Sequence, residues 1–146
     1  ALNDSAAGHF VYHNSTPNIH EITYNDGFVY VTGYDNPHIS VAKLEGDNLN
    51  NLNFQKAADY TNDIVHNFRK VEFHGEGIAI RGNDLYALVT ANPNGGYESY
   101  ADSYVLKYKM NSDGSLSHEK GKDVVRVGKN STEIEPYNNL LMIPSM

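Results

Sequence analysis

A unit of 56 residues recurs along this 146-residue chain and restricts its fold more than any other feature of the sequence. Each unit begins with a strand pattern around an isoleucine, at Ile22, Ile78 and Ile134. A short run rich in Asn, Asp or Gly follows, and then a second strand pattern. Two strand patterns joined by such a turn form a β-hairpin, and Asp26-Gly27 is the clearest turn of this kind. The sequence therefore predicts three repeated hairpins.

Further strands extend the first two hairpins. The predicted hairpin strands cover residues 20–24, 28–32, 76–80, 85–90, 133–136 and 140–143. Third strands are predicted at 39–44 and 104–110, and an outer strand at 123–127 in the second unit. In the first unit, residues 55–68 fit either an outer strand or a short helix. A helix is indicated because apolar residues recur there at helical spacing, namely Ala57, Tyr60, Ile64, Val65 and Phe68.

Repeated units of four strands are typical of β-propeller blades, which bury both faces of each small sheet against neighbours. We therefore expect an all-β fold of four-stranded antiparallel blades. Residues 1–18 are expected to contribute an N-terminal strand (Phe10 to Tyr12) that completes a neighbouring blade. Residues 19–74 and residues 75–130 are expected to form one blade each. Residues 131–146 are expected to form the first two strands of a further blade. Propellers close with about 4 to 8 blades. The ring is therefore expected to be incomplete, and either the remaining blades of a longer parent chain or a second copy would complete it.

Composition excludes several classes of function. The net charge is −7 and there is no Lys/Arg-rich run, which argues against nucleic-acid binding. No apolar stretch approaches the length of a membrane span. The chain has no cysteine, no Gly-x-Ser-x-Gly motif and no phosphate-binding glycine loop. These absences favour a non-catalytic protein.

The innermost strands of a propeller line its central channel, and the loops at one end form the usual site. Three acids, Glu21, Glu76 and Glu133, are expected at equivalent places where the inner strands begin. Such glutamates equally accept backbone hydrogen bonds or face water, whereas Tyr-rich loops can stack against sugars or peptides. The predicted ligand-binding residues are His20, Glu21, Tyr34, Asp35, His38, Asn92, Tyr97, Tyr100 and Glu133.

Two segments resemble known propeller families. Residues 29–34 (Val-Tyr-Val-Thr-Gly-Tyr), followed by Ile39-Ser40-Val41, resemble the YVTN-type repeat of surface-layer and secreted bacterial or archaeal proteins. That resemblance implies an extracellular or cell-surface module that binds a glycan or protein, or has a structural role, without catalysis. Residues 76–80, with Asp84-Leu85-Tyr86, resemble the blade opening of NHL and gluconolactonase-like propellers. This second resemblance implies an alternative function, a metal-dependent lactonase. In that alternative Glu76 would bind a divalent cation such as calcium and His74 would be the general base; no other cofactor is indicated.

Overall fold

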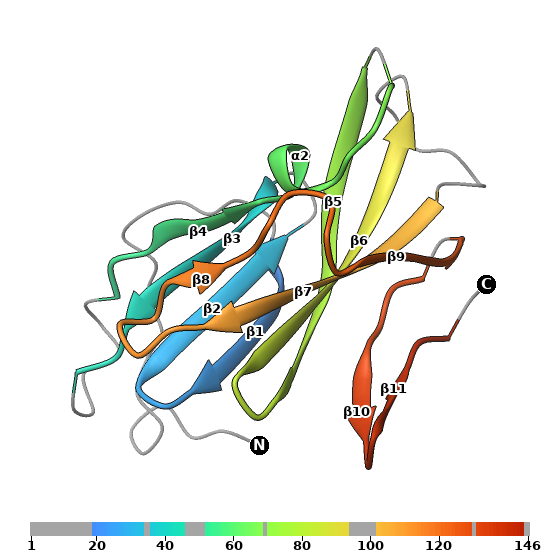
Figure 1. Cartoon of the computed structure of the whole chain (residues 1–146). Coiled ribbons are helices and arrows are strands. Elements are labelled where there is room, and N and C mark those ends of the chain that lie inside the picture. Colours follow the sequence, from blue (N-terminus) through green and yellow to red (C-terminus); the bar gives the residue numbers. More distant parts are fainter. Residues whose placement is uncertain are drawn as a thin grey trace, which may run out of the picture.

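The computed structural model describes residues 19–33, 36–45, 52–68, 70–93, 102–129 and 131–144. These ranges contain strands β1 to β11 and one short helix, α2 (Figure 1). Every strand pair in them is antiparallel, so the fold is all-β as predicted. The strand predicted at Phe10 to Tyr12 lies outside the described residues. No helix within these ranges is long and apolar enough to span a membrane.

The first sheet is a meander in which each strand pairs with the next one along the chain. Its strands are β1 (Ile19–Asn25), β2 (Phe28–Gly33), β3 (Asn36–Lys43) and β4 (Gln55–Asp59). Asp26 and Gly27 form the turn between β1 and β2, with φ angles of 48° and 87°. A positive φ at both turn positions matches the twist of the two strands, and Gly and Asp adopt it more readily than bulky residues do.

The second sheet repeats this arrangement with longer strands. Its strands are β5 (Val71–Arg81), β6 (Asp84–Pro93), β7 (Asp102–Met110), β8 (Leu116–Ser117) and β9 (Val124–Lys129). The short β8 and the longer β9 both pair with β7, β8 at its end and β9 at its beginning. A third hairpin follows, formed by β10 (Glu135–Tyr137) and β11 (Leu140–Met142).

The three hairpins keep the 56-residue spacing of the sequence. The residue pairs that flank their turns are Asn25–Phe28, Arg81–Asp84 and Tyr137–Leu140. The predicted hairpins are therefore confirmed, as are the third strands β3 and β7 and the outer strand β9. One prediction was too short: the inner strand expected at residue 76 begins at Val71. Residues 71–75 continue the ladder with β6, so His74 lies inside β5.

The segment that fitted either a strand or a helix contains both. Strand β4 pairs with β3, and α2 (Tyr60–Asp63) follows it directly. The Asp59 carboxylate caps this single turn by accepting a hydrogen bond from the Thr61 amide at 3.0 Å. Tyr60 and Ile64 are fully buried. The helical spacing of the apolar residues thus brings two side chains into the core, but the helix ends after one turn.

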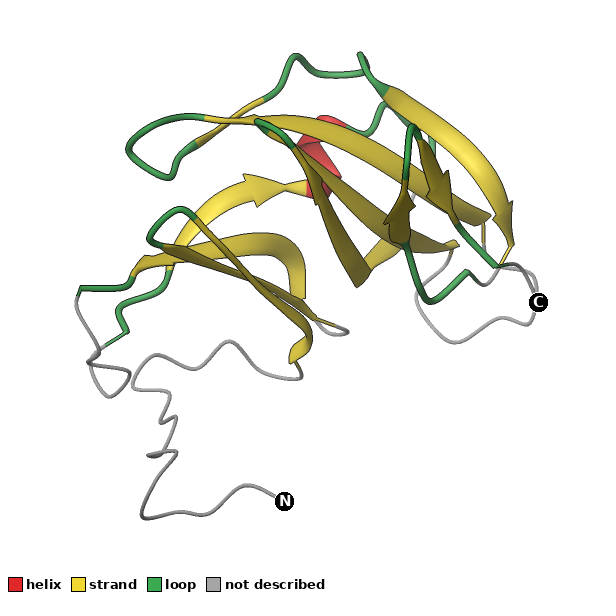
Figure 2. Cartoon of the chain, turned by 90° about the horizontal axis from the view of Figure 1, so that it is seen from below, coloured by secondary structure: helices red, strands yellow, loops and turns green. Residues whose placement is uncertain are grey.

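The two sheets pack face to face, and α2 lies where the first sheet leads into the second (Figure 2). Their shared core contains Tyr30 and Ile39 from the first sheet, and Ile78, Leu85 and Leu106 from the second. Burial of each such side chain stabilises the fold by roughly 1.5 to 3 kcal/mol. The packing of the two sheets against each other therefore stabilises the fold.

The opposite face of the second sheet packs against the segment that contains the third hairpin. Ile134 is buried there against Ala79, Leu88 and Val105, with Leu141 of β11 packed beside them. Each sheet therefore covers one face of the unit that follows it in sequence. The described sheets do not close into a ring.

Candidate functional site

The first strands of the two sheets, β1 and β5, were expected to be inner strands, and they lie in contact with each other. Each is interrupted by a β-bulge, a point where one residue is left out of the ladder. The bulged residues are His20 in β1 and Glu76 in β5. The ladder pairs on either side involve Ile19 and Glu21 in β1, and Gly75 and Gly77 in β5. Bulges redirect side chains and are common next to functional sites.

The two glycines beside Glu76 allow β5 to lie between its neighbours. A Cβ atom at Gly75 would lie 1.8 Å from Thr32 Oγ1 of the first sheet. A Cβ atom at Gly77 would lie 3.1 Å from Ile134 Cγ2 on the other side. The sequence Gly-Glu-Gly thus gives the strand two close contacts and leaves one side chain, Glu76, to point out of the ladder.

The bulges bring His20 and Glu76 together. His20 Nδ1 lies 3.5 Å from Glu76 Oε2, and the Glu76 side chain is only 8% exposed. Burial raises the pKa of Glu76, and the nearby His20, His74 and Thr90 side chains counteract part of that effect. The carboxyl group therefore holds its proton to a higher pH than a glutamate in water would.

A second histidine belongs to the same group of residues. His74 Nε2 lies 3.4 Å from the exposed carboxylate of Glu72, and His74 Nδ1 lies 3.3 Å from Asn92 Nδ2. Because the amide nitrogen of Asn92 donates to Nδ1, the proton of the neutral ring is on Nε2, where it faces Glu72. We call His20, His74, Glu76, Thr90 and Asn92 the inner-strand cluster.

Asn92 leaves one acceptor of this cluster unused. Its side chain is almost fully buried, and Oδ1 has no hydrogen-bond partner among the described residues. A buried carbonyl without a partner costs about 1 to 3 kcal/mol. The cluster therefore combines a carboxyl group, two imidazoles and an unsatisfied amide oxygen, which suits a ligand with hydroxyl or N–H donors.

The three predicted acids do not occupy equivalent places. The 56-residue spacing aligns Glu21 with Gly77 and Glu133, whereas Glu76 aligns with His20 and takes the bulge position. Burial raises the pKa of Glu21, and the charges of Glu135 and Glu133 raise it further. Glu21 and Glu133 thus lie within electrostatic reach of each other, whereas the neighbours that act on the pKa of Glu76 are His20 and His74.

The other predicted ligand-binding residues either lie apart from the inner-strand cluster or fall outside the described residues. His38 lies on β3, with Nε2 3.6 Å from Asp59 Oδ2 of β4. Burial lowers the pKa of His38, and the Asp59 charge opposes this. This histidine therefore takes part in a cross-strand pair. The predicted ligand-binding residues outside the described ranges are Tyr34, Asp35, Tyr97 and Tyr100.

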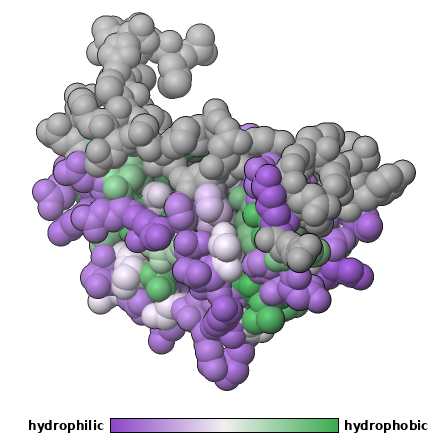
Figure 3. All heavy atoms as spheres, turned by 90° about the horizontal axis from the view of Figure 1, so that it is seen from above, coloured by the Kyte–Doolittle hydropathy of each residue, from purple (hydrophilic) through white to green (hydrophobic). Residues whose placement is uncertain are grey.

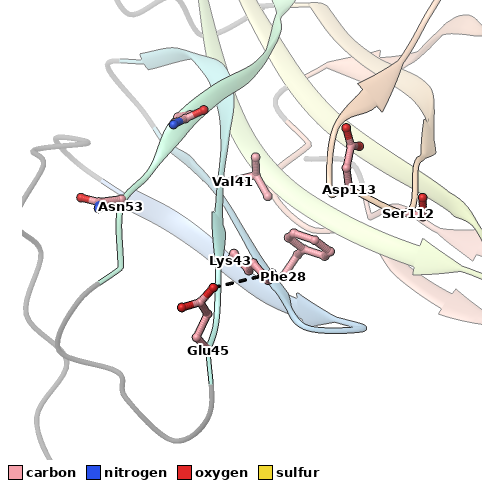
Figure 4. A pocket seen from close by; sticks show the side chains of 8 residues that line it. Phe28, Val41, Lys43, Glu45, Asn53, Ser112 and Asp113 are labelled. Atoms are coloured by element: carbon pink, nitrogen blue, oxygen red, sulfur yellow. Dashed lines mark ion pairs between the residues drawn. The ribbon is translucent and has the colours of Figure 1, made fainter.

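A cavity of about 730 Å³ was not anticipated from the sequence (Figure 4). It lies between the first sheet and the turn at Ser112 and Asp113, with Phe28 and Val41 as its apolar side chains and an ion pair between Lys43 and Glu45 at one side. Asn53 and Gln55 complete its lining. Its residues come from two units and form no local motif, so no sequence signal identifies it.

A metal site can be tested against the same residues. Within the described ranges, no three His, Cys, Asp or Glu side chains are arranged to hold a metal ion. Glu76 and His74 do not supply the several oxygen ligands that calcium requires. The role of Glu76 as a metal ligand therefore stays a prediction, and these residues give it no support.

Thr90 is the member of the inner-strand cluster that the sequence did not suggest. It pairs with His74 across β5 and β6, and this pair exists only because the ladder extends to residues 71–75 of β5.

No protein-family model, curated protein or solved structure matches this chain. The function must therefore be argued from the fold and the site.

Proposed function

We propose that this chain is a portion of a β-propeller that acts outside the cytoplasm as a non-catalytic, surface-layer-type binding module. The supporting observation is the repeated unit: antiparallel sheets of four and five strands packed face to face, with equivalent hairpins every 56 residues. Blades of a propeller pack in this way around a central channel. The YVTN-type resemblance of residues 29–34 supports a location at the cell surface.

The inner-strand cluster is the binding site in this proposal. Its buried carboxyl group, two imidazoles and unsatisfied Asn92 oxygen offer hydrogen bonds in several directions. Sugars with hydroxyl and N-acetyl groups present the matching donors and acceptors. A cell-surface glycan is therefore the ligand class that this chemistry favours.

The test is binding to a panel of oligosaccharides that contain N-acetylhexosamines, measured by calorimetry. Glu76→Gln should weaken binding of any recognised oligosaccharide at least about tenfold, because a site carboxylate is a strong acceptor for sugar hydroxyls. Glu119→Gln is the matched control, since Glu119 is exposed and pairs with Lys122. Equal affinity of the two variants, or no binding to any member of the panel, would contradict the proposal.

The same proteins separate this proposal from the lactonase alternative. Calcium alone is titrated into wild type and Glu76→Gln. A binding isotherm that disappears in Glu76→Gln, together with lactone hydrolysis that requires calcium, would favour the metal-dependent hydrolase. Oligosaccharide binding that is unchanged by a chelator supports the binding module.

A further inference from the structure

Two groups of exposed apolar side chains lie at opposite ends of the row of sheets. The first group, which we call the front surface, consists of Ile22 and Tyr24 on β1. The second, the rear surface, consists of Tyr137, Leu140 and Met142 on the third hairpin. On the side shown in Figure 3, by contrast, hydrophilic residues cover most of the described surface. Exposed apolar groups of this kind mark sites of protein association.

The internal repeat shows what normally covers the front surface. Ile22, Ile78 and Ile134 occupy the same position in successive units. Ile78 is 5% exposed because the first sheet covers it, and Ile134 is 4% exposed because the second sheet covers it. Ile22 is 48% exposed. The front surface is therefore the face that a preceding sheet covers in the other two units.

The register places Ile22 and Tyr24 on one face of the first sheet. They pair with Val31 and Val29 of β2, and residues opposite each other in a ladder share a face. Leu52 and Phe54 pack against Val29 and Val31 but leave the two β1 side chains exposed. The exposed apolar area is thus an extension of a face that is already partly packed.

The rear surface has the complementary position. Tyr137 pairs with Leu140, on the face of the hairpin opposite to Leu141, which packs with Ile134 on the second sheet. In the first two sheets the corresponding face covers the next unit, through Tyr30 in one case and Ala79 in the other. One chain therefore carries both halves of the same type of interface, each without its partner among the described residues.

We infer that the rear surface of one copy of this chain packs on the front surface of a second copy, head to tail. This inference rests on the proposed propeller arrangement, because it extends the packing of successive units from one chain to the next. Such an interface leaves one free surface at each end of a dimer. Association then continues until a ring closes.

The inference is tested by light scattering during size-exclusion chromatography over a range of concentrations. Wild type should show a mass that rises with concentration to at least that of two chains. Ile22→Glu and Leu140→Glu should each weaken self-association at least about tenfold, because a charge then lies in an apolar contact. Val65→Glu is the control, since Val65 is an exposed apolar residue outside both surfaces.

Mixing the two variants distinguishes head-to-tail packing from other dimers. Ile22→Glu keeps an intact rear surface and Leu140→Glu keeps an intact front surface, so an equal mixture should form a dimer of one copy of each. If glutamate prevents folding, Ile22→Ser and Leu140→Ser take their place. A wild type that stays monomeric at all concentrations, or a mixture that stays monomeric, would overturn the inference. The oligosaccharide measurements with Glu76→Gln would still test the proposed function separately.

Discussion

Replacing Gly75 by alanine should destabilise the protein strongly, because β5 lies against the first sheet at this residue. The added Cβ would lie 1.8 Å from Thr32 Oγ1, whereas ordinary contacts begin at about 3.4 Å. Thr32 is fully buried and its hydroxyl is 2.7 Å from that of Tyr60. Overpacking costs about 1 to 3 kcal/mol, and a broken buried hydrogen bond about 1 to 3 kcal/mol more.

We therefore expect the free energy of unfolding to fall by about 2 to 6 kcal/mol, or the Tm by roughly 4 to 24 °C for a chain of this size. Urea unfolding followed by circular dichroism measures it. Gly77→Ala is the matched control: its Cβ would meet Ile134 Cγ2 at 3.1 Å, and a side-chain methyl can move, so the cost should stay below about 1 kcal/mol.

A double variant identifies the cause of the effect. Thr32→Ala removes the nearest atom, and the remaining Thr32 Cβ is 2.9 Å from the added group. Gly75→Ala should therefore cost less in the Thr32→Ala background than in wild type. Gly75→Ala within about 0.5 kcal/mol of wild type, or as mild as Gly77→Ala, would refute the close packing of the two sheets described above.

Three further outcomes are expected. Ile78→Ala should cost about 2 to 5 kcal/mol in urea unfolding and Ile22→Ala less than about 1.5 kcal/mol at monomeric concentrations, since only Ile78 is covered; equal costs would contradict this. Because burial raises the pKa of Glu76, wild type should lose stability as the pH rises from the ordinary glutamate value of 4.5 through the raised pKa, so the Tm of Glu76→Gln relative to wild type should increase over that range, and a constant difference would contradict a buried carboxyl group. Tyr30→Phe removes the hydroxyl that donates to the Gly114 carbonyl at 2.9 Å, and thermal unfolding should show a loss of about 1 to 2 kcal/mol, in contrast to an unchanged Tm if that bond is absent in solution.

Much of the fold could be predicted because its signals are local. Asp26-Gly27 between two alternating segments specifies a hairpin, and the 56-residue spacing transfers that assignment to the other units. The early start of β5 at Val71 could not be predicted, because it depends on the length of β6 with which it pairs. The choice between strand and helix at residues 55–68 had no single answer, since β4 and α2 share that segment.

The sequence named several residues of the candidate site, but not their arrangement. His20, His74 and Glu76 were expected where the inner strands begin, and Asn92 in the loop that follows the second strand of the second unit. The pairing of His20 with Glu76 depends on two bulges, and that of His74 with Asn92 depends on a ladder between residues 18 positions apart. Alternation rules do not reveal bulges. The sequence therefore suggested three equivalent acids where the structure has a histidine facing a carboxyl group.

At the bulge formed by Glu76, a deletion and a substitution should affect the fold differently. Phe73 and Ile78 belong to the same core, although strict alternation would place them on opposite faces. The extra residue restores the phase between the two halves of β5. A deletion there would reverse the faces of every residue before it, whereas a substitution breaks no ladder pair. The length of the strand at this point is thus set by folding, and the identity of the bulged residue is open to selection for binding.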